Sequence, residues 1–358
     1  MAIDLNAIDM TFAYHPFFII CVMVYLLIFG IFNIWNAFNT RNNPEKRDHP
    51  EYFKNEIIVG VAFFIVMGFY PFLFDKIVTN DYVKAQIYFH LWNSLTVHIL
   101  MWVICIPIWR WNNKRKGYNL TYEQWKEKIR KSFKDNIRSD FKRKMMHLIP
   151  AGIIIGFYYL GVALDPTLRL YGWDGVSFTI FFQATVGVHF LWMMNIGDHL
   201  RLRHFDWLGG FAINWNEGAI KTSELDTITS ANHMALALVP FVMSNLSILF
   251  AVALIMAISD AMASIVGKGI GKKRNPASNK TIEGYLAGMI TTYAIVLIVH
   301  TFAPFEGATW FLVNGLALGA ALGFLLVDRF ATEISDNFLN PVVCGSIMWA
   351  VYSIFILL

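Results

Sequence analysis

Charged residues are scarce in this sequence of 358 residues. Asp, Glu, Lys and Arg together make up only 15% of it, whereas 56% of the residues are hydrophobic. Soluble domains carry about 25% charged and about 45–50% apolar residues. The deficit excludes an ordinary soluble domain and predicts an integral membrane protein, with membrane lipids as neighbours and no nucleic acid as a partner.

Cysteine is scarce as well. Cys21, Cys105 and Cys344 all lie in apolar runs and have neither metal-ligand spacing nor the pattern of a disulfide framework, so they are expected to be small core residues. The first residues lack both a positively charged stretch and a small-residue cleavage site. The first apolar run is therefore expected to be a retained span. The sequence also lacks an internal repeat and a low-complexity tract.

Long apolar runs dominate what is present. A membrane-spanning helix needs about 20 apolar residues. Ten runs are assigned as spans: 16–37, 57–75, 86–109, 146–164, 176–197, 231–245, 247–265, 285–303, 308–327 and 338–358. Residues 231–265 are too long for one helix and are divided near Ser244 and Asn245, whose polar side chains suit a turn. The sequence therefore predicts an all-α, polytopic transmembrane helical bundle of about ten spans.

The distribution of basic residues predicts the orientation, because cytoplasmic loops hold the excess of Lys and Arg. With ten spans, all but three of the 29 Lys and Arg residues fall in loops on one side; the exceptions are Lys76, Lys84 and Arg169. Treating 231–265 as one span would weaken this bias. Both termini are therefore expected on the non-cytoplasmic side, in the cell membrane or, in a eukaryote, the endoplasmic reticulum.

A long polar segment divides the chain into three parts: a three-span region of unknown role (1–109), a basic linker (110–145) and a seven-span region (146–358). In the linker, Thr121 and Gln124 have the spacing of a capping box. Apolar residues then recur every four positions from Trp125 to Phe141, which predicts an amphipathic helix. This helix is expected either at the membrane surface or packed on the cytoplasmic face of the protein itself, and the sequence favours neither.

Ionisable groups within or beside a span are costly and usually functional, and four polar clusters lie on the predicted cytoplasmic side. The first contains Arg143, Lys144 and His147, where Arg and Lys can bind phosphate, unless they only flank a span. The second contains Lys221 and Glu224 before a helix that opens with hydroxyl residues. It can hold Mg²⁺ or orient a polar headgroup, or it is a solvated loop with a helix cap.

The third cluster carries the strongest signal. Asp260 lies near the end of an apolar helix, and Gly267 and Gly271 let backbone N–H groups approach an anion. The charged residues that follow are Lys268, Lys272, Lys273, Arg274, Lys280 and Glu283. Mg²⁺ commonly uses one or two carboxylates together with substrate phosphates. The glycine pattern alone is weak because no Walker sequence surrounds it, and Gly284 also suits a small-residue helix contact. The alternative is a merely basic loop.

The fourth cluster opens the last span with Glu333, Asp336 and Asn337, followed by Pro341. It suits a second cation or nucleotide contact, or it is an ordinary acidic turn.

Taken together, these motifs resemble those of the polyprenol kinase family. The matching elements are Arg-Lys-x-x-His, a Glu-containing loop, Asp-Ala-x-Ala-x-x-x-Gly, Lys-x-x-Glu-Gly and Asp-Asn-x-x-x-Pro, within about residues 140–358. The family includes dolichol, phytol and farnesol kinases and the CTP-dependent diacylglycerol kinase, and it looks related to phosphatidate cytidylyltransferase. This sequence departs from it at Ser259, where glycine is usual, and at Ser335, where the family often has aspartate.

The resemblance implies transfer of a phosphate from CTP, or else ATP, to the hydroxyl of a lipid alcohol at the cytoplasmic face. The expected catalytic residues are Asp260, Glu224, Lys280 and Glu283. The expected nucleotide- and phosphate-binding residues are Arg143, Lys144, Lys221, Gly267, Gly271, Lys272, Lys273, Arg274, Lys280, Gly284 and Asn337. The expected Mg²⁺ ligands are Asp260, Glu283 and Asp336. A cytidylyltransferase and a transporter or other non-catalytic membrane protein remain the alternatives.

Overall fold

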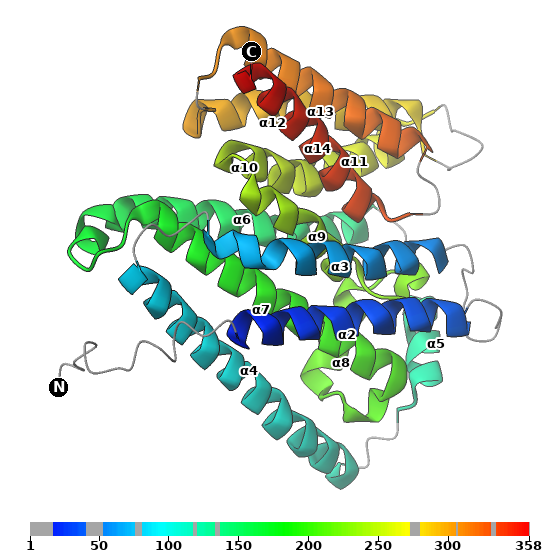
Figure 1. Ribbon diagram of the computed structural model, residues 1–358. Helices are drawn as coiled ribbons and strands as arrows, with labels where there is room; N and C mark the ends of the chain where they lie inside the picture. The colour runs from blue at the N-terminus through cyan, green and yellow to red at the C-terminus, as the bar shows by residue number, and fades with distance from the viewer. Residues whose placement is uncertain are drawn as a thin grey trace.

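The computed structural model describes residues 17–40, 53–75, 81–116, 120–132, 137–272, 280–305, 307–330 and 334–357. All regular secondary structure in these ranges is helical, which confirms the predicted all-α class. The long helices lie side by side along one general direction, and α4 diverges from the others (Figure 1).

The α-helices are α2 (Phe17–Thr40), α3 (Phe53–Asp75), α4 (Asp81–Arg115), α5 (Tyr122–Ser132), α6 (Ile137–Arg169), α7 (Gly175–Arg203), α8 (Gly210–Ala219), α9 (Ser230–Leu238), α10 (Leu246–Leu254), α11 (Asp260–Ile270), α12 (Ile282–Phe302), α13 (Trp310–Phe330) and α14 (Asp336–Leu357). Short 3₁₀ turns are η3 (Phe205–Trp207), η4 (Thr222–Glu224) and η5 (Val239–Met243), and η6 (Ile255–Ser259) is a π-helical turn.

Nine of the described helical segments are long and apolar enough to cross a membrane. The tenth predicted span, 231–245, is instead a shorter apolar helix, Ser230–Met243, formed by α9 and η5. The turn predicted at Ser244 and Asn245 is confirmed. The Asn245 side chain accepts a hydrogen bond of 2.9 Å from the N–H of Ser247 and so caps α10.

Several helices extend beyond the apolar runs that predicted them. α4 continues to Arg115 and α6 begins at Ile137, although the runs end at 109 and begin at 146. Charged residues lower the hydropathy of a segment, but the helix satisfies its own backbone hydrogen bonds whatever its side chains are. Hydropathy therefore locates the apolar middle of a span better than its ends.

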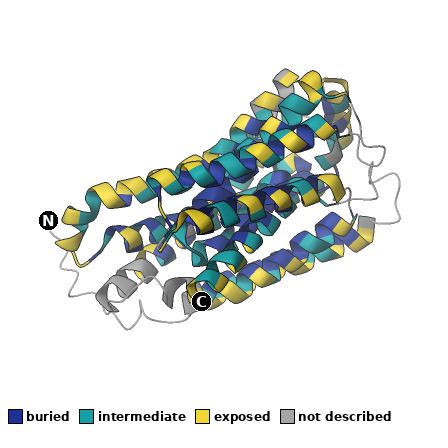
Figure 2. Ribbon diagram, turned by 90° about the horizontal axis from the view of Figure 1, so that it is seen from above, coloured by how far each residue is buried: buried dark blue, intermediate teal, exposed yellow. Residues whose placement is uncertain are grey.

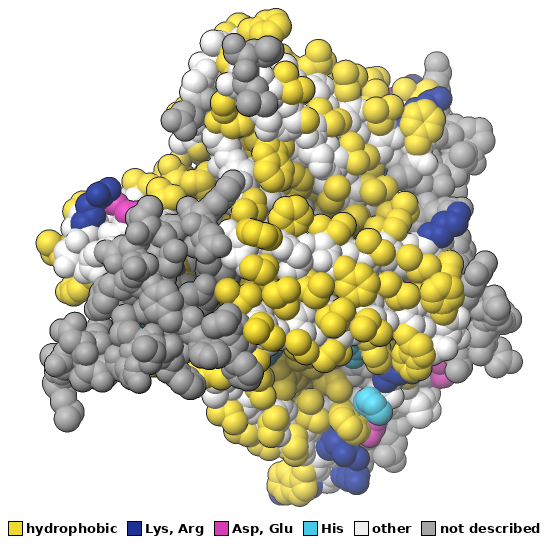
Figure 3. All heavy atoms as spheres, viewed as in Figure 1, with side chains coloured by type: hydrophobic (Ala, Val, Ile, Leu, Met, Phe, Trp, Pro, Cys, Tyr) yellow, Lys and Arg dark blue, Asp and Glu magenta, His cyan; other side chains and the backbone are white. Residues whose placement is uncertain are grey.

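Apolar side chains cover much of the outer surface, and the interior is also apolar. Figure 3 shows hydrophobic atoms across the middle of one face, with Lys and Arg toward its edges. Figure 2 shows the complementary pattern, in which buried residues line the inner faces of the helices and exposed residues the outer faces. A membrane protein has this distribution because lipid tails are as apolar as its core.

The ends of the described long helices lie on two opposite sides of the bundle. Asn55, near the start of α3, contacts Ser335 at the start of α14. The start of α2 and the end of α14 lie at the opposite end of the bundle (Figure 1). These two ends share a side, as the expected orientation requires, and the cytoplasmic identity of the other side stays a prediction.

The linker helix α5 packs on the protein itself, which confirms the second of its two alternatives. Trp125 and Ile129 are buried in a cluster with residues of α7, η3 and α8. Thr121 and Gln124 form the predicted capping box, with reciprocal hydrogen bonds of 3.0 and 3.3 Å. α5 is described as far as Ser132, and Phe133 lies outside the described residues. Ile137 and Phe141 belong to α6, where Phe141 is 50% exposed and does not continue the buried stripe.

The N-terminal helices share a core with the rest of the chain. α2 and α3 cross closely, because a Cβ on Gly60 would lie only 3.0 Å from the carbonyl oxygen of Gly30. Side chains of both helices, such as Leu26 and Phe63, belong to one buried cluster with Trp192 of α7 and with residues of α9 and α14. The three-part division of the chain stays a prediction, and the first part packs directly on the last.

Candidate active site

Lys144 and Asp260 form a buried ion pair between α6 and α11. Their side chains are 5% and 9% exposed. Asp260 follows the π-turn η6, and such turns are frequent at functional sites. Ser259, which replaces the usual glycine, has ordinary helical backbone angles, and its hydroxyl shares a hydrogen bond of 2.9 Å with Thr292 of α12. The departure from the family pattern is therefore accommodated, and α12 holds the turn before Asp260.

Lys280 joins two carboxylates at the ends of α13 and α14. Its ammonium group lies 2.6 Å from Asp328 and 3.3 Å from Asp336. Burial alone lowers the pKa of Lys280, but the carboxylates of Asp336 and Asp328 outweigh this effect and raise its pKa above the ordinary value. Lys280 is therefore held as a cation. Asp328 was not among the predicted site residues, although an acid at the end of a span is itself a signal.

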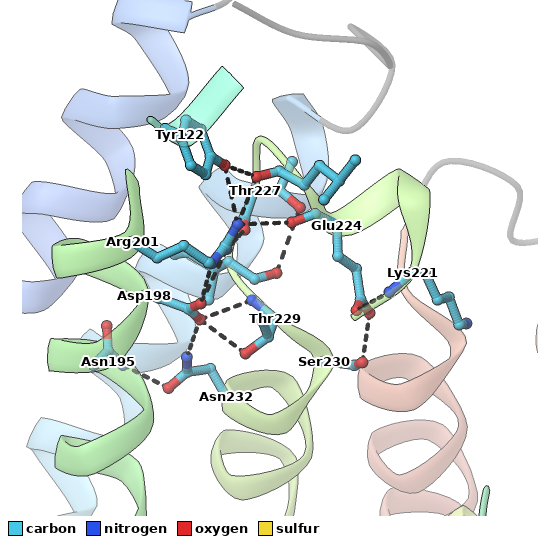
Figure 4. Close-up of polar contacts among 12 residues, drawn as sticks. Tyr122, Asn195, Asp198, Arg201, Lys221, Glu224, Thr227, Thr229, Ser230 and Asn232 are labelled. Carbon is cyan, nitrogen blue, oxygen red and sulfur yellow. Dashed lines mark hydrogen bonds and ion pairs between the residues drawn. The ribbon is translucent and has the colours of Figure 1, made fainter. Parts of the chain in front are cut away.

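The loop that carries Lys221 and Glu224 is held by a buried network that the sequence analysis also missed. Arg201 of α7, with no exposed surface, pairs with Asp198 and donates hydrogen bonds to the carbonyl groups of Leu225 and Thr227. Figure 4 shows Arg201 reaching from α7 into the loop. Five guanidinium N–H donors suit this bracing of several backbone acceptors.

Asp198 completes the network from the other side. It accepts hydrogen bonds of 2.8 Å from the N–H and the hydroxyl of Thr229 and from the Asn232 amide (Figure 4). Glu224 accepts hydrogen bonds from the Ser230 hydroxyl and from the N–H of Lys221, the second at 3.2 Å. The Glu224 carboxylate is therefore fixed at the start of α9.

A cleft of about 90 Å³ lies between α6, α7, α8 and the start of α9. Its polar lining includes Arg143, His147, Glu224 and Ser230, and its apolar lining includes Met146, Ile149, Pro150, Phe190, Met194 and Met234. Ile149 and Trp215 line the cleft and are also exposed on the outer surface. One wall of the cleft is therefore polar and another faces the lipid.

The charged groups and the cleft adjoin one another at His147. The charges of Lys144, Lys221 and Asp336 all act on this buried ring, which also lines the cleft. Lys221 and Lys144 act on Asp336 as well. The structure thus brings together residues from the first, second and fourth predicted clusters, with Asp260 and Lys280 of the third.

The glycines of the third cluster serve helix packing. A Cβ on Gly284 would lie 2.7 Å from the carbonyl oxygen of Ala263, and one on Gly271 would lie 2.5 Å from the Thr281 hydroxyl. A Cβ on Gly267 would lie 2.9 Å from the Thr281 hydroxyl. These contacts fit the small-residue alternative and place α11 directly against the start of α12. Phosphate binding by these glycines stays a prediction.

The remaining predicted residues lie at the same end of the bundle or outside the described ranges. Glu283 is in the first turn of α12, and Lys272 is exposed just after α11. Asn337, in the first turn of α14, is buried, and its side-chain oxygen has no hydrogen-bond partner among the described residues. Lys273, Arg274 and Glu333 lie outside the described residues.

Metal binding by protein groups alone has no support in the described ranges, where no three His, Cys, Asp or Glu side chains are grouped to hold an ion. Asp260 is paired with Lys144, and Asp336 with Lys280. This arrangement fits an ion that arrives with a polyphosphate, since Mg²⁺ usually takes only one or two protein carboxylates in such sites.

Comparison with known proteins adds one relative to this geometry. The chain is similar to a dolichol kinase of Schizosaccharomyces pombe, at 26% identity over 288 residues, which cover 75% of this chain and 49% of the relative. The chain thus spans about half the length of that protein. No family model matches the chain, and no solved structure matches it.

Proposed function

We propose that this protein is a membrane-embedded lipid kinase. It transfers the terminal phosphate of CTP or ATP to the hydroxyl of a polyprenol, a phytol-like alcohol or a diacylglycerol at the cytoplasmic face. One observation carries the proposal: a cluster of Lys and Asp side chains adjoins a cleft with one polar and one lipid-facing wall, and His147 borders both. A soluble polyphosphate and an oily alcohol need such a boundary to meet. The similarity to a dolichol kinase supports it.

The charged cluster would bind the nucleotide. Phosphoryl transfer depends on positioning and charge neutralisation rather than on covalent chemistry by the protein. Lys144, Lys221 and Lys280 supply positive charge from three chain segments. Lys144 is paired with Asp260, and Lys280 with Asp328 and Asp336. Asp260, Glu283 and Asp336 are the carboxylates that would hold Mg²⁺, which would neutralise charge on the phosphates.

The cleft would bind the lipid alcohol. Its volume of about 90 Å³ suits a hydroxyl and the first carbons of a chain. Glu224 lines the cleft with its carboxylate fixed by Ser230 and by the N–H of Lys221. It would accept the proton of the attacking hydroxyl. The tail would leave past Ile149 toward the bilayer.

A product assay tests the proposal. Purified protein in lipid nanodiscs receives Mg²⁺, labelled CTP or ATP, and a panel of polyprenol, phytol, farnesol and diacylglycerol. We expect a labelled lipid monophosphate and the nucleoside diphosphate, at least 100-fold less of it with Asp260→Asn, and no loss with Asp165→Asn. Asp165 is a matched control because its ion pair with Arg169 lies near the other end of α6.

Two results would reject the proposal. With a lipid phosphate such as phosphatidate added to the panel, a CDP-lipid with released pyrophosphate would identify a cytidylyltransferase instead, because a CDP-lipid forms from CTP and a lipid phosphate. If no alcohol is labelled and Asp260→Asn behaves like the wild type, the protein is not a lipid kinase.

A further inference from the structure

The N-terminal region reaches the candidate site through Asn55 of α3. This side chain is 3% exposed and lies between two elements of the seven-span region. Its oxygen accepts a hydrogen bond of 3.0 Å from the N–H of Ser335, and its amide nitrogen lies 3.1 Å from Nε2 of His233 on α9. One buried amide thus contacts His233, which is 178 positions away in sequence, and Ser335, which is 280 positions away.

The chemistry of these partners determines the direction of both hydrogen bonds. A backbone N–H can only donate, so the Asn55 oxygen must face Ser335. The Asn55 NH₂ group can only donate, so it donates to Nε2 of His233. The neutral His233 ring therefore has no proton on Nε2 and carries its proton on Nδ1. Asn55 thus holds one tautomer of a buried histidine.

Ser335 directly precedes α14, and its position determines where Asp336 lies. The Ser335 carbonyl accepts the first helical hydrogen bonds, from the N–H groups of Phe338 and Leu339, each at 3.0 Å. The next residue, Asp336, pairs with Lys280. A helix start exposes N–H groups that need partners outside the helix, and Asn55 satisfies the one on Ser335. A chain of contacts therefore runs from α3 through Ser335 and Asp336 to Lys280.

We propose that Asn55 is a positioning residue that holds the start of α14 and the Nδ1-protonated form of His233. α3 therefore contributes to the geometry of the site. The α2–α3 pair is then required for activity and is not merely an anchor. The statement about activity rests on the proposed lipid kinase function, whereas the statement about α14 and His233 does not. Groups that orient others in this way typically change activity by about 10- to 100-fold when removed.

Two structural measurements test whether Asn55 holds α14 and His233, and neither depends on enzymatic activity. Hydrogen exchange of the segment 334–340 should speed up in Asn55→Ala and stay protected in Asn55→Asp, because a carboxylate oxygen still accepts from Ser335. Nitrogen NMR of ring-labelled histidine, with the signal assigned by its loss in His233→Gln, should show the Nδ1–H tautomer in the wild type. In Asn55→Asp the ring should bear a proton on Nε2, because an ionised carboxylate can only accept.

Kinetics then separate positioning from general stability. We expect Asn55→Ala to lower kcat about 10- to 100-fold with little change in the KM of the lipid alcohol, because Asn55 and His233 do not themselves line the cleft, whereas the contacts through Ser335 lead to Lys280. Asn36→Ala is the matched control. Asn36 is a buried asparagine on α2 that accepts a hydrogen bond of 2.9 Å from Arg203 instead. It should leave exchange at 334–340, the tautomer and kcat unchanged.

The outcomes are distinct. Unchanged exchange and an unchanged tautomer in Asn55→Ala would overturn the proposal, as would equal effects of Asn55→Ala and Asn36→Ala on exchange. If the wild type phosphorylates no alcohol, the proposed function fails, while the exchange and NMR results still decide whether Asn55 holds α14 and His233.

Discussion

Replacing Arg201 with Met should release the loop that carries Lys221 and Glu224. The guanidinium has no exposed surface, pairs with Asp198 at 3.0 Å and braces the carbonyl groups of Leu225 and Thr227. Removing one partner of a buried ion pair costs about 3–5 kcal/mol because the other charge is left behind. Asp198 keeps three other donors, two from Thr229 and one from Asn232, so the cost should lie near the lower figure.

Hydrogen exchange measures this cost locally. About 3 kcal/mol corresponds to on the order of 100-fold, since each 1.4 kcal/mol is tenfold, so the amides of residues 221–229 should exchange on the order of 100-fold faster in Arg201→Met. Lys128→Met is the control. Lys128 is 56% exposed and pairs with Glu217 at 2.7 Å, and an exposed pair contributes at most about 1 kcal/mol.

A double-mutant cycle separates the ion pair from the other contacts. Asp198→Asn combined with Arg201→Met should destabilise the loop by less than the sum of the two single changes, because either change alone leaves a buried charge without its main partner. Strictly additive effects, or no faster exchange in Arg201→Met than in Lys128→Met, would refute the view that this pair holds the loop. Activity should fall in Arg201→Met in step with the exchange of the loop.

Three further outcomes follow from the site. Gly284→Ala should reduce the free energy of unfolding by about 1–3 kcal/mol through overpacking, because its Cβ would meet the Ala263 carbonyl, and so should lower the thermal midpoint in detergent. Gly269→Ala should leave the midpoint unchanged, since a Cβ there would have nothing within 4 Å. Equal midpoints for the two variants would contradict this. Lys280→Met should reduce phosphate transfer at least 100-fold in the labelled-nucleotide assay, whereas Lys272→Met, exposed after α11, should retain most activity. The pKa of Lys280 is raised above its ordinary value of 10.5 in the folded protein. The stability that its ion pairs contribute should therefore be present below pH 10.5 and be lost only as the pH rises through the higher folded-state pKa. A loss of stability near pH 8 in a thermal-denaturation series would show that Lys280 is not held as a cation.

Much of the fold was predictable because a bilayer makes simple demands on a sequence. Each crossing needs a long apolar run whose backbone bonds are internal, so the runs from 16–37 to 338–358 predicted the helices with few errors. The turn at Ser244 and Asn245 was predictable for the same reason, since two polar residues interrupt an apolar run of excessive length. The range 231–245 was also close to the observed helix Ser230–Met243, but that helix is too short to count among the nine candidate spans of the described residues.

The site was predictable only where functional residues stand out against apolar neighbours. Asp260 and Lys280 are conspicuous near the ends of spans, and both lie in the charged cluster. Asp198 and Arg201 were overlooked because they directly follow the apolar run 176–197 among other polar residues, where they form no recognisable motif. Asn55 was overlooked for a different reason, since an asparagine 280 positions from its partner in sequence gives no local signal.

The sequence by itself determined that the chain crosses a membrane many times, that its helices follow the apolar runs, and that acids and bases gather on one predicted side. Those properties depend on the free energy of placing each segment in lipid, which is a local quantity. Only the tertiary structure decided which acid meets which base, that the glycines after Asp260 pack two helices together, and that α3 touches the start of α14. Such pairings depend on how helices far apart in the chain pack side by side, and local composition does not encode them.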